Sequence, residues 1–411
     1  MNSLEYKNNK LIFDNLELSE CCKKLQTPFY IYSENLIKKN IQEYIANSND
    51  KTMFCYSVKA NSNLSILKII ASEGMGFDVV SKGELYRVIK AGADTKKIVY
   101  SGVGKTSDEI KYALANDILC FNVESESELI AINNQAALMN CSAQISIRVN
   151  PNVSVRTHPY ISTGMKENKF GISFDKVLSV YKKASKLSNI NIVGIDFHIG
   201  SQITSIDPYI DSVKSIKDLI SALKKENITI SHIDVGGGLG INYEKNRVIE
   251  KSEYTKAIIN SLSDIDAKII FEPGRSIVGD CGLLVTKIEY IKETNTKNFM
   301  IVDASMTELL RPPLYNAYHK ITPVIKHEKK CKLYDVVGPV CESADFLGKD
   351  RSLNSLESEF LVVEDVGAYG SVLSSNYNTR PKVAEYIITD GVIKEIRSRD
   401  TLDQIISNES L

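Results

Sequence analysis

From residue 52 onward, short apolar segments alternate with longer amphipathic segments. The short ones are rich in Val, Ile, Phe and Tyr, as β-strands are, and they lie at residues 52–59, 76–81, 98–102, 118–124, 144–150, 192–200, 231–238 and 267–274. The longer ones, such as residues 81–92 and 214–226, carry apolar side chains at helical spacing. Because parallel strands need crossover connections, this alternation predicts a parallel sheet.

The size of the alternating region favours a closed barrel. Eight strand–helix units over roughly 225 residues match a (β/α)8 barrel of the TIM type. An open, doubly wound sheet is the alternative, but the glycine-rich turn that its dinucleotide site requires after the first strand is missing. We therefore predict an α/β fold with a barrel domain over residues 28–277.

After about residue 277 the pattern changes to short alternating runs. They lie at residues 283–291, 298–305, 332–340 and 359–366, and such runs predict antiparallel strands. We expect residues 278–411 to form an antiparallel β-rich second domain. The strand-like segment 9–18 is expected to pair with this domain, which then includes residues 1–27.

Composition and charge narrow the possible functions. Fifty Lys and Arg residues against 51 Asp and Glu residues give a net charge of −1, and no basic block suggests a nucleic-acid partner. The N-terminus is polar, unlike a signal peptide, and no apolar run is long enough for a membrane span. The eight cysteines include no Cys-x-x-Cys pattern, so we expect neither a metal site nor disulfides. A cytoplasmic protein with reduced thiols is the expectation.

Polar and reactive residues gather where the predicted barrel strands end. All strand ends of such a barrel face one rim, which is where barrel enzymes place their chemistry. The side chains expected to meet there belong to Lys59, Asp78, Ser101, Glu124, Arg148, His198, the glycines 236–238 and Glu272.

Lys59 ends the first of these strands in the sequence YSVKAN. The simpler interpretation is a surface lysine just past the strand. The functional interpretation is a Schiff-base lysine, whose amine must be partly desolvated to act as a nucleophile. Such a lysine is the covalent anchor of pyridoxal phosphate (PLP), and we count Asp78 among the cofactor-binding residues of the same rim.

Three neighbouring segments favour the functional interpretation. Three consecutive glycines, among them Gly237 and Gly238, close the seventh strand, and loops after strands seven and eight of barrels commonly hold phosphate. The eighth strand is closed by Glu272-Pro273-Gly274-Arg275. The Glu272 carboxylate could pair with a pyridinium nitrogen, and Arg275 and the free backbone amides could bind oxyanions. His198 can stack on an aromatic ring, and Ser201 can donate to phosphate.

The second domain offers groups for the substrate. PLP accepts the electrons that remain on Cα when CO₂ leaves, and an acid must then reprotonate that carbon. Cys341 is a candidate for this acid, since a thiol titrates within reach of neutrality, although a small buried cysteine is the ordinary alternative. Arg311, close to Tyr315, suits a bidentate contact with a carboxylate, and Tyr369 is a further polar group between turn formers.

At this point the chain resembles the diaminopimelate decarboxylases, which belong to the fold-type III (alanine-racemase-like) PLP decarboxylases. Nine ordered stretches between about residues 10 and 400 carry the resemblance: YSVKAN, GFDVVSKGEL, THPYISTGMKENKFGI, HIGSQ, GGGLG, EPGR, RPPLYNAYH, GPVCESADFL and GAYG. The resemblance implies a PLP-bearing barrel and a β domain in a homodimer with shared active sites.

The resemblance also assigns roles. It makes Lys59 the cofactor anchor, stacks His198 on the ring and places Glu272 at the pyridinium nitrogen. Phosphate contacts fall to Ser201, Gly237, Gly238 and the segment Glu272–Arg275, with Tyr369 touching both cofactor and substrate. The implied substrate contacts are Arg275, Arg311, Tyr315, Glu342 and Tyr369. Cys341 and Glu342 are expected to reach into the partner subunit's site.

Glu342 and Arg311 determine the expected substrate. Ornithine decarboxylases are similar to this chain in the barrel domain, but they carry Asp after the cysteine, where this chain has Glu342. The distal end of diaminopimelate carries an amine and a carboxylate, which one Glu and one Arg match. Lysine, ornithine and arginine would leave a desolvated arginine unpaired. The expected reaction is decarboxylation of meso-diaminopimelate to L-lysine and CO₂, the last step of lysine biosynthesis, with the D-configured carbon implied by the resemblance alone.

Three alternatives stay open from sequence. The first is a related decarboxylase of ornithine, arginine or carboxynorspermidine. The second is a racemase, which would need a second base opposite Lys59 and usually avoids a carboxylate such as Glu272. The third is a non-catalytic regulator, although such relatives usually lose the cofactor lysine or the phosphate loop.

Overall fold

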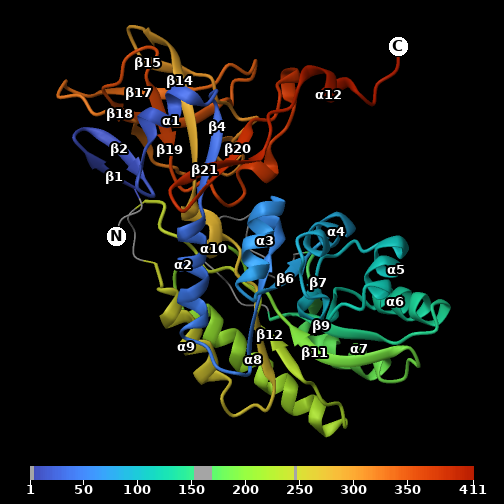
Figure 1. Cartoon of the computed structure of the whole chain (residues 1–411). Coiled ribbons are helices and arrows are strands. Elements are labelled where there is room, and N and C mark those ends of the chain that lie inside the picture. The colour runs from blue at the N-terminus through green and yellow to red at the C-terminus, as the bar shows by residue number, and fades with distance from the viewer. Residues whose placement is uncertain (1–3, 152–168, 245–247) are drawn as a thin grey trace. The chain divides into compact units, whose positions relative to one another are not determined.

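A computed structural model describes residues 4–151, 169–244 and 248–411. The chain divides into two compact units: one comprises residues 40–241 and 247–276, and the other residues 1–39, 242–246 and 277–411. Figure 1 shows the path of the chain. Within the described residues, no helix is both long and apolar enough to cross a membrane.

The first unit is a closed parallel barrel, as the alternating pattern predicts. Strands β5 to β9 and β11 to β13 pair in chain order, and β13 closes the ring by pairing with β5. Their bounds are β5 Thr52–Ser57, β6 Gly76–Val79, β7 Ile98–Tyr100, β8 Cys120–Val123, β9 Ala143–Asn150, β11 Ile190–Asp196, β12 His232–Asp234 and β13 Lys268–Phe271. A two-residue strand, β10 (Ile172–Ser173), pairs with β9. Each of the eight predicted strand segments overlaps one strand of the barrel.

Helices form the outer layer of the barrel unit (Figure 1). They are α2 Glu34–Ile45, α3 Leu64–Ser72, α4 Lys82–Lys90, α5 Ser107–Ala115, α6 Glu126–Leu138, α7 Phe174–Ala184, α8 Asp207–Lys225 and α9 Lys251–Ser261, followed by the short α10 Arg275–Val278. Polar caps fix where several begin. At α5 the Thr106 hydroxyl accepts from the Glu109 amide while the Glu109 carboxylate accepts from the Thr106 amide, an arrangement that satisfies two otherwise unpaired donors.

Period-two alternation builds two layers inside the barrel. Cys55, Val99, Cys120 and Ile270 form one buried apolar cluster. Because side chains two residues apart on a strand share a face, the same strands next present Ser57, Ser101, Asn122 and Glu272 to the interior, and these are joined by hydrogen bonds. An apolar floor therefore supports a polar layer at the carboxyl ends of the strands.

The second unit is β-rich, and its main sheet is mixed rather than purely antiparallel. Its strand order is β18-β17-β15-β14-β4-β20-β21, with parallel pairing between β15 and β17 and between β20 and β4. The strands are β4 Phe29–Ser33, β14 Gly282–Glu293, β15 Asn298–Val302, β16 Ile321–Pro323, β17 Lys332–Val337, β18 Phe346–Leu353, β19 Phe360–Val363, β20 Ala384–Thr389 and β21 Val392–Arg397. Helices α1 Leu18–Lys24, α11 Arg311–Tyr315 and α12 Leu402–Ile406 complete the unit.

The N-terminal region corrects the predicted domain boundary. Strand β4 pairs with β14 and β20, so in Figure 1 the blue strand β4 lies beside the red strand β20. The predicted start of the barrel at residue 28 is therefore too early, because β4 completes the other unit's sheet. The segment 9–18 forms two strands, β2 (Lys10–Phe13) and β3 (Leu16–Glu17), in a small sheet with β1 (Leu4–Lys7). It joins the β-rich unit as expected, since the Leu11 amide donates to the Val324 carbonyl.

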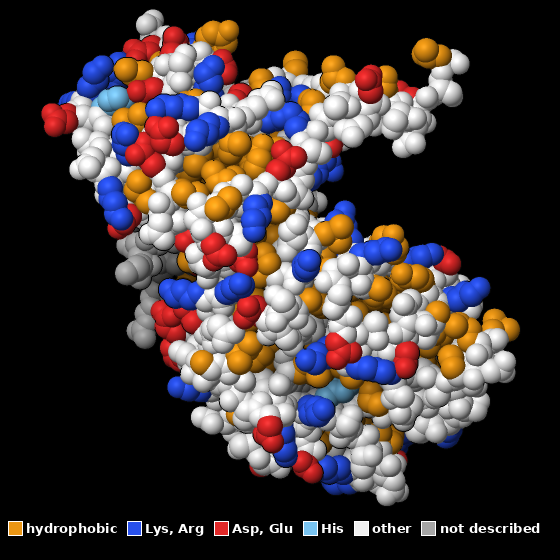
Figure 2. Space-filling model, in the orientation of Figure 1, with side chains coloured by type: hydrophobic (Ala, Val, Ile, Leu, Met, Phe, Trp, Pro, Cys, Tyr) orange, Lys and Arg blue, Asp and Glu red, His pale blue; other side chains and the backbone are white. Residues whose placement is uncertain are grey.

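Charge is spread over the surface. On the face seen in Figure 2, basic and acidic side chains are interspersed, in keeping with the near-zero net charge.

Candidate active site

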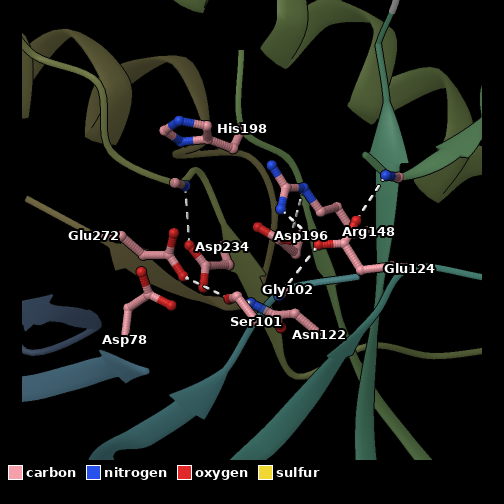
Figure 3. A network of polar contacts seen from close by, with 12 residues as sticks. Asp78, Ser101, Gly102, Asn122, Glu124, Arg148, Asp196, His198, Asp234 and Glu272 are labelled. Atoms are coloured by element: carbon pink, nitrogen blue, oxygen red, sulfur yellow. Dashed lines mark hydrogen bonds and ion pairs between the residues drawn. The ribbon is translucent and has the colours of Figure 1, made fainter. Parts of the chain in front are cut away.

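The polar layer of the barrel brings together the side chains that the sequence places at the strand ends (Figure 3). Ser57 donates to Asp78 Oδ2 at 3.0 Å, and Ser101 lies 3.5 Å from Glu272 Oε1. Asn122 donates to the Ser101 hydroxyl at 3.1 Å. Strands β5 to β8 and β13 thus contribute to one continuous network, as expected for the rim of a closed barrel.

Lys59 lies just beyond β5 and not within it. The strand ends at Ser57, and Val58–Ala60 form a single 3-10 turn, which corrects the prediction that Lys59 terminates the strand. The Lys59 ammonium lies 2.8 Å from Asp78 Oδ2, with 38% of the lysine side chain exposed and Asp78 fully buried. The amine is therefore both accessible and held by a carboxylate.

Asp78 is ionised because of its partners. Burial raises the pKa of its carboxyl, but the charge of Lys59 and hydrogen bonds from Lys59, Ser101 and Ser57 outweigh burial and hold the pKa below its ordinary value. The Lys59–Asp78 pair is consequently a stable ion pair at the mouth of a largely buried network.

Three buried carboxyl groups lie beside this pair. Asp196, Asp234 and Glu272 each place an oxygen within 4.8 Å of the other two. Burial, reinforced by the neighbouring carboxylates, raises the pKa of Glu272 and of Asp196 well above the ordinary range and that of Asp234 to about 7. Like charges this close cannot all ionise, so the cluster retains protons at neutral pH.

Arg148 balances part of this negative charge. Its Nη1 lies 2.7 Å from Glu124 Oε1, and its Nε lies 3.7 Å from Asp196 Oδ2. Glu124 also accepts from the backbone amides of Gly102 and Gly171. The ion pair therefore ties the ends of β8 and β9 to two rim loops.

Asp196, Asp234 and Asn122 are site residues that the sequence interpretation missed. Each lies in a barrel strand and is buried: Asn122 in β8, Asp196 at the end of β11 and Asp234 at the end of β12. A charged residue in such a strand is rarely buried without a partner, and this was the signal that could have identified the two aspartates.

The triple glycine after β12 is held closely against the rest of the rim. Gly236 has a φ of +67° and Gly238 a φ of +100°, and residues other than glycine rarely adopt such positive φ angles. A Cβ on Gly237 would lie 2.1 Å from the Glu272 carbonyl oxygen. The Gly236 amide donates to Asp234 Oδ1 at 2.9 Å, so the carboxylate also orients this loop.

His198 is neutral and fixed in one tautomer. The Gly237 amide donates to its Nδ1 at 3.2 Å, so Nδ1 carries a lone pair and Nε2 carries the proton. Burial and the positive charges of Arg148 and Lys59 lower the pKa of His198 well below its ordinary value. The site thus contains a flat, uncharged imidazole.

Ser201 and the segment after β13 complete the rim. Arg275 Nη2 donates to the Ser201 hydroxyl at 2.9 Å. The Ser57 amide donates to the Pro273 carbonyl at 3.1 Å, and a Cβ on Gly274 would lie 3.0 Å from Ser57 Cβ. A hydroxyl, a guanidinium and backbone amides are the usual ligands of a phosphate group.

These donors fit PLP. The predicted cofactor needs an amine for its aldehyde, an acid for its ring nitrogen, a planar neighbour and donors for its phosphate. Lys59, Glu272, His198 and the Ser201–Arg275 pair offer these groups, all within one unit of the chain.

Most of the predicted substrate residues belong to the β-rich unit, whereas Arg275 lies in the barrel unit. Arg311 is buried at the start of α11 and Tyr315 ends this helix. Cys341 and Glu342 are exposed, on a turn that the buried Asp345 supports by accepting from the Val340 amide at 2.7 Å. The structure therefore places most predicted cofactor residues in the barrel unit and most predicted substrate residues in the β-rich unit; Arg275 and Tyr369, predicted for both, lie one in each.

Of two further predicted features, the structure describes Tyr369 but not most of the motif THPYISTGMKENKFGI. Tyr369 has φ +57°, a left-handed conformation that is uncommon for residues other than glycine and is concentrated at functional sites. Most of the motif THPYISTGMKENKFGI, residues 157–168, lies outside the described residues.

Comparison with known proteins agrees with this chemistry. Residues 34–279 match the family described as "Pyridoxal-dependent decarboxylase, pyridoxal binding domain". Diaminopimelate decarboxylase of Vibrio cholerae is 46% identical over 407 residues, which cover 98% of each chain. That of Aquifex aeolicus is 44% identical over 98% of this chain and 96% of its own.

Solved structures of relatives have the same fold over the whole chain. Diaminopimelate decarboxylase from Helicobacter pylori, complexed with L-lysine, superposes with a TM-score of 0.93 at 43% identity, covering 96% of this chain and 99% of that one. The M. jannaschii enzyme in complex with L-lysine superposes with a TM-score of 0.95 at 36% identity, covering 100% and 98%. With its pyridoxal-binding domain matched and its full length covered, the chain belongs to the diaminopimelate decarboxylase family of PLP-dependent decarboxylases.

Proposed function

We propose that this enzyme decarboxylates meso-diaminopimelate to L-lysine and CO₂, the last step of lysine biosynthesis. The observation that carries the proposal is the Lys59–Asp78 ion pair beside the proton-retaining carboxyl of Glu272, in a chain 46% identical to a diaminopimelate decarboxylase.

The barrel rim supplies the cofactor half of the site. PLP, when bound, provides an electron sink for the pair of electrons left on Cα as CO₂ departs. Lys59 would be the covalent anchor of the cofactor, and Asp78 would hold the Lys59 amine in place. Glu272 would supply a proton for the ring nitrogen, and the neutral imidazole of His198 would offer a flat face to the ring.

Anion-binding groups of the rim hold the phosphate. In our proposal Ser201, the amides of Gly237 and Gly238, and the segment Glu272–Arg275 bind its oxygens. Tyr369 contributes to cofactor and substrate contacts from the other unit, and Arg275 also contacts the substrate. The support is the donor set, because charge-assisted hydrogen bonds to phosphate are the strong ones.

Residues of the β-rich unit select the substrate. We assign Glu342 to the distal amine of diaminopimelate and Arg311, with Tyr315, to its distal carboxylate. Arg311 suits a carboxylate because its guanidinium is planar and always charged. A diamino acid with a single carboxylate, such as ornithine, would have no distal carboxylate for the Arg311 guanidinium. This mismatch excludes ornithine as a substrate in our proposal.

A second subunit completes the site in this proposal. Cys341 delivers a proton to Cα after CO₂ leaves, and Glu342 follows it on the same exposed turn. Their exposure in the single chain supports a homodimer in which this turn enters the partner's barrel. The cytoplasmic location of the enzyme stays a prediction.

The direct test is product formation. Purified protein supplied with PLP is incubated with meso-diaminopimelate, and lysine and CO₂ are quantified, with ornithine and arginine run alongside. Lysine from diaminopimelate, without amines from the other two, is the expected result. Preferential turnover of ornithine would overturn the assignment of Glu342 and Arg311.

A further inference from the structure

A buried histidine holds the guanidinium that we assign to the substrate carboxylate. Arg311 Nε donates to His319 Nε2 at 3.2 Å. The other ring nitrogen of His319, Nδ1, lies 2.9 Å from the backbone carbonyl oxygen of Glu364. His319 is completely buried and Arg311 nearly so, so both bonds are shielded from water.

The two partners of His319 define its protonation. A backbone carbonyl only accepts hydrogen bonds, so the Nδ1 nitrogen that faces Glu364 must carry a proton. An arginine only donates, so the Nε2 nitrogen that faces Arg311 must present its lone pair. His319 is therefore a neutral imidazole with opposite hydrogen-bonding roles at its two nitrogens.

The β-sheet fixes the position of this imidazole. Strand β16 pairs with β19 through Ile321 and Val363, and the Glu364 amide donates to the Lys320 carbonyl at 2.9 Å. His319 thus stands two residues before the paired strand β16. Its hydrogen bond to the Glu364 carbonyl anchors the ring to the same rigid edge.

An aromatic ring borders the pair. The Tyr243 ring lies edge-on to His319, with centroids 5.2 Å apart and an interplanar angle of 77°. Arg311 Cζ lies 5.2 Å from the centroid of the same Tyr243 ring, within the range of a cation–π contact. The guanidinium is thereby held by a hydrogen bond along its Nε edge and by an aromatic ring.

This clamp restricts how Arg311 can meet a carboxylate. A guanidinium binds a carboxylate in bidentate fashion through Nε and one Nη, or through its two Nη groups. Because His319 occupies Nε, only the edge with the two Nη groups can make a full bidentate contact. We propose that His319 is a positioning residue that orients Arg311 end-on toward the distal carboxylate of the substrate. The proposal rests on the role of Arg311 in the proposed function.

Two substitutions separate the two hydrogen bonds of His319. His319→Asn keeps a side-chain donor near the position of Nδ1 for the Glu364 carbonyl but removes the acceptor for Arg311. His319→Gln places an amide oxygen near the position of Nε2 and keeps that acceptor. A role in orienting Arg311 predicts damage from the first variant and rescue by the second.

A pair of ligands separates carboxylate recognition from general binding. L-Lysine, the expected product, retains the distal carboxylate, whereas 1,5-diaminopentane has the same two amines without it. Binding of each to the PLP-loaded enzyme is measured by titration of the cofactor absorbance and by calorimetry. His319→Asn should weaken lysine binding about tenfold, leave 1,5-diaminopentane binding unchanged, and raise KM for diaminopimelate more than it lowers kcat.

Arg311→Met, alone and combined with His319→Asn, completes a double-mutant cycle. In the Arg311→Met background, His319→Asn should have no further effect on lysine binding, because His319 acts only through that arginine. Wild-type lysine affinity in His319→Asn would overturn the inference, as would equal loss of both ligands in the Asn and Gln variants, which marks a packing role. Wild-type lysine affinity in Arg311→Met would instead refute the proposed role of Arg311.

Discussion

In the barrel unit the polar side chains at the strand ends bind one another, whereas in the β-rich unit Cys341 and Glu342 stand exposed on a turn. Lys59, Asp78 and Glu272 are partners within one network. The turn that carries Cys341 and Glu342 is well braced by Asp345, yet its two reactive side chains face outward. The first region is assembled by the fold of one chain. The second leaves Cys341 and Glu342 accessible to a ligand or to another chain.

This difference separates two kinds of function. Buried charges need partners that the fold itself supplies, so the barrel network is suited to hold and tune a cofactor. Exposed groups keep their hydration until a ligand or another chain covers them, which suits recognition. The following predictions test whether substitutions in the two regions affect cofactor and substrate separately.

The largest effect is expected at Lys59. Lys59→Ala removes the only group proposed to bind the cofactor covalently, so activity should fall on the order of 10³-fold or more. The visible absorbance of the lysine-bound cofactor should vanish with it. Lys51→Ala, at the opposite end of β5 in an exposed ion pair, is the matched control. Unchanged absorbance in Lys59→Ala would contradict the assignment.

Glu272→Gln should have the next largest effect. A neutral amide cannot maintain a proton at the ring nitrogen, so we expect kcat to fall about 100-fold while the cofactor stays bound. Steady-state kinetics combined with absorbance spectra of the loaded protein measure both quantities. Glu226→Gln, at the surface end of α8, serves as the control. Loss of the cofactor in Glu272→Gln would instead indicate a binding role.

Glu342→Asp should affect the substrate alone. Shortening this side chain withdraws the carboxylate from the distal amine, so KM for diaminopimelate should rise about tenfold. The affinity for PLP should not change, because Glu342 is not among the residues proposed to bind the cofactor. Ser343→Ala on the same turn is the control. Equal losses in substrate use and PLP binding would show that the turn has a structural role.

The smallest effect concerns the pH dependence of stability. Asp234 has a pKa of about 7 in the folded state and about 4 in the unfolded state, so it binds more protons when the protein is folded. Its contribution to the free energy of unfolding therefore falls as pH rises from about 4 to about 7. Asp234→Asn should flatten that fall in urea unfolding of the cofactor-free protein, with Asp211→Asn as the control. Identical pH profiles for Asp234→Asn and the unsubstituted protein would contradict a retained proton.

Much of the barrel could be predicted from the sequence. Strand and helix periods are local, and barrel closure brings strand ends such as Lys59, His198 and Glu272 to one rim. The polar network among these residues confirms that expectation. The place of β4 in the second sheet could not be predicted from local patterns. Its partners β14 and β20 lie about 250 or more residues later along the chain, so only tertiary pairing reveals it.

The buried carboxyl cluster was also beyond local patterns. Asp196 and Asp234 each end a different strand, and only the closed ring places them beside Glu272. The clamp on Arg311 is of the same kind, since His319 gains its role from the pairing of β16 with β19. Sequence motifs identify groups that can do chemistry, whereas the fold decides which of them share protons.

Subunit complementation tests most directly whether the two regions serve one shared site. Lys59→Ala and Cys341→Ala proteins are mixed, allowed to exchange subunits, and assayed for lysine formation from diaminopimelate. If the turn enters the partner's barrel, each mixed dimer regains one intact site, and activity should return to about a quarter of the wild-type value. A mixture of Lys59→Ala with Glu272→Gln is the control. No recovery in the first mixture would contradict a site built from two subunits.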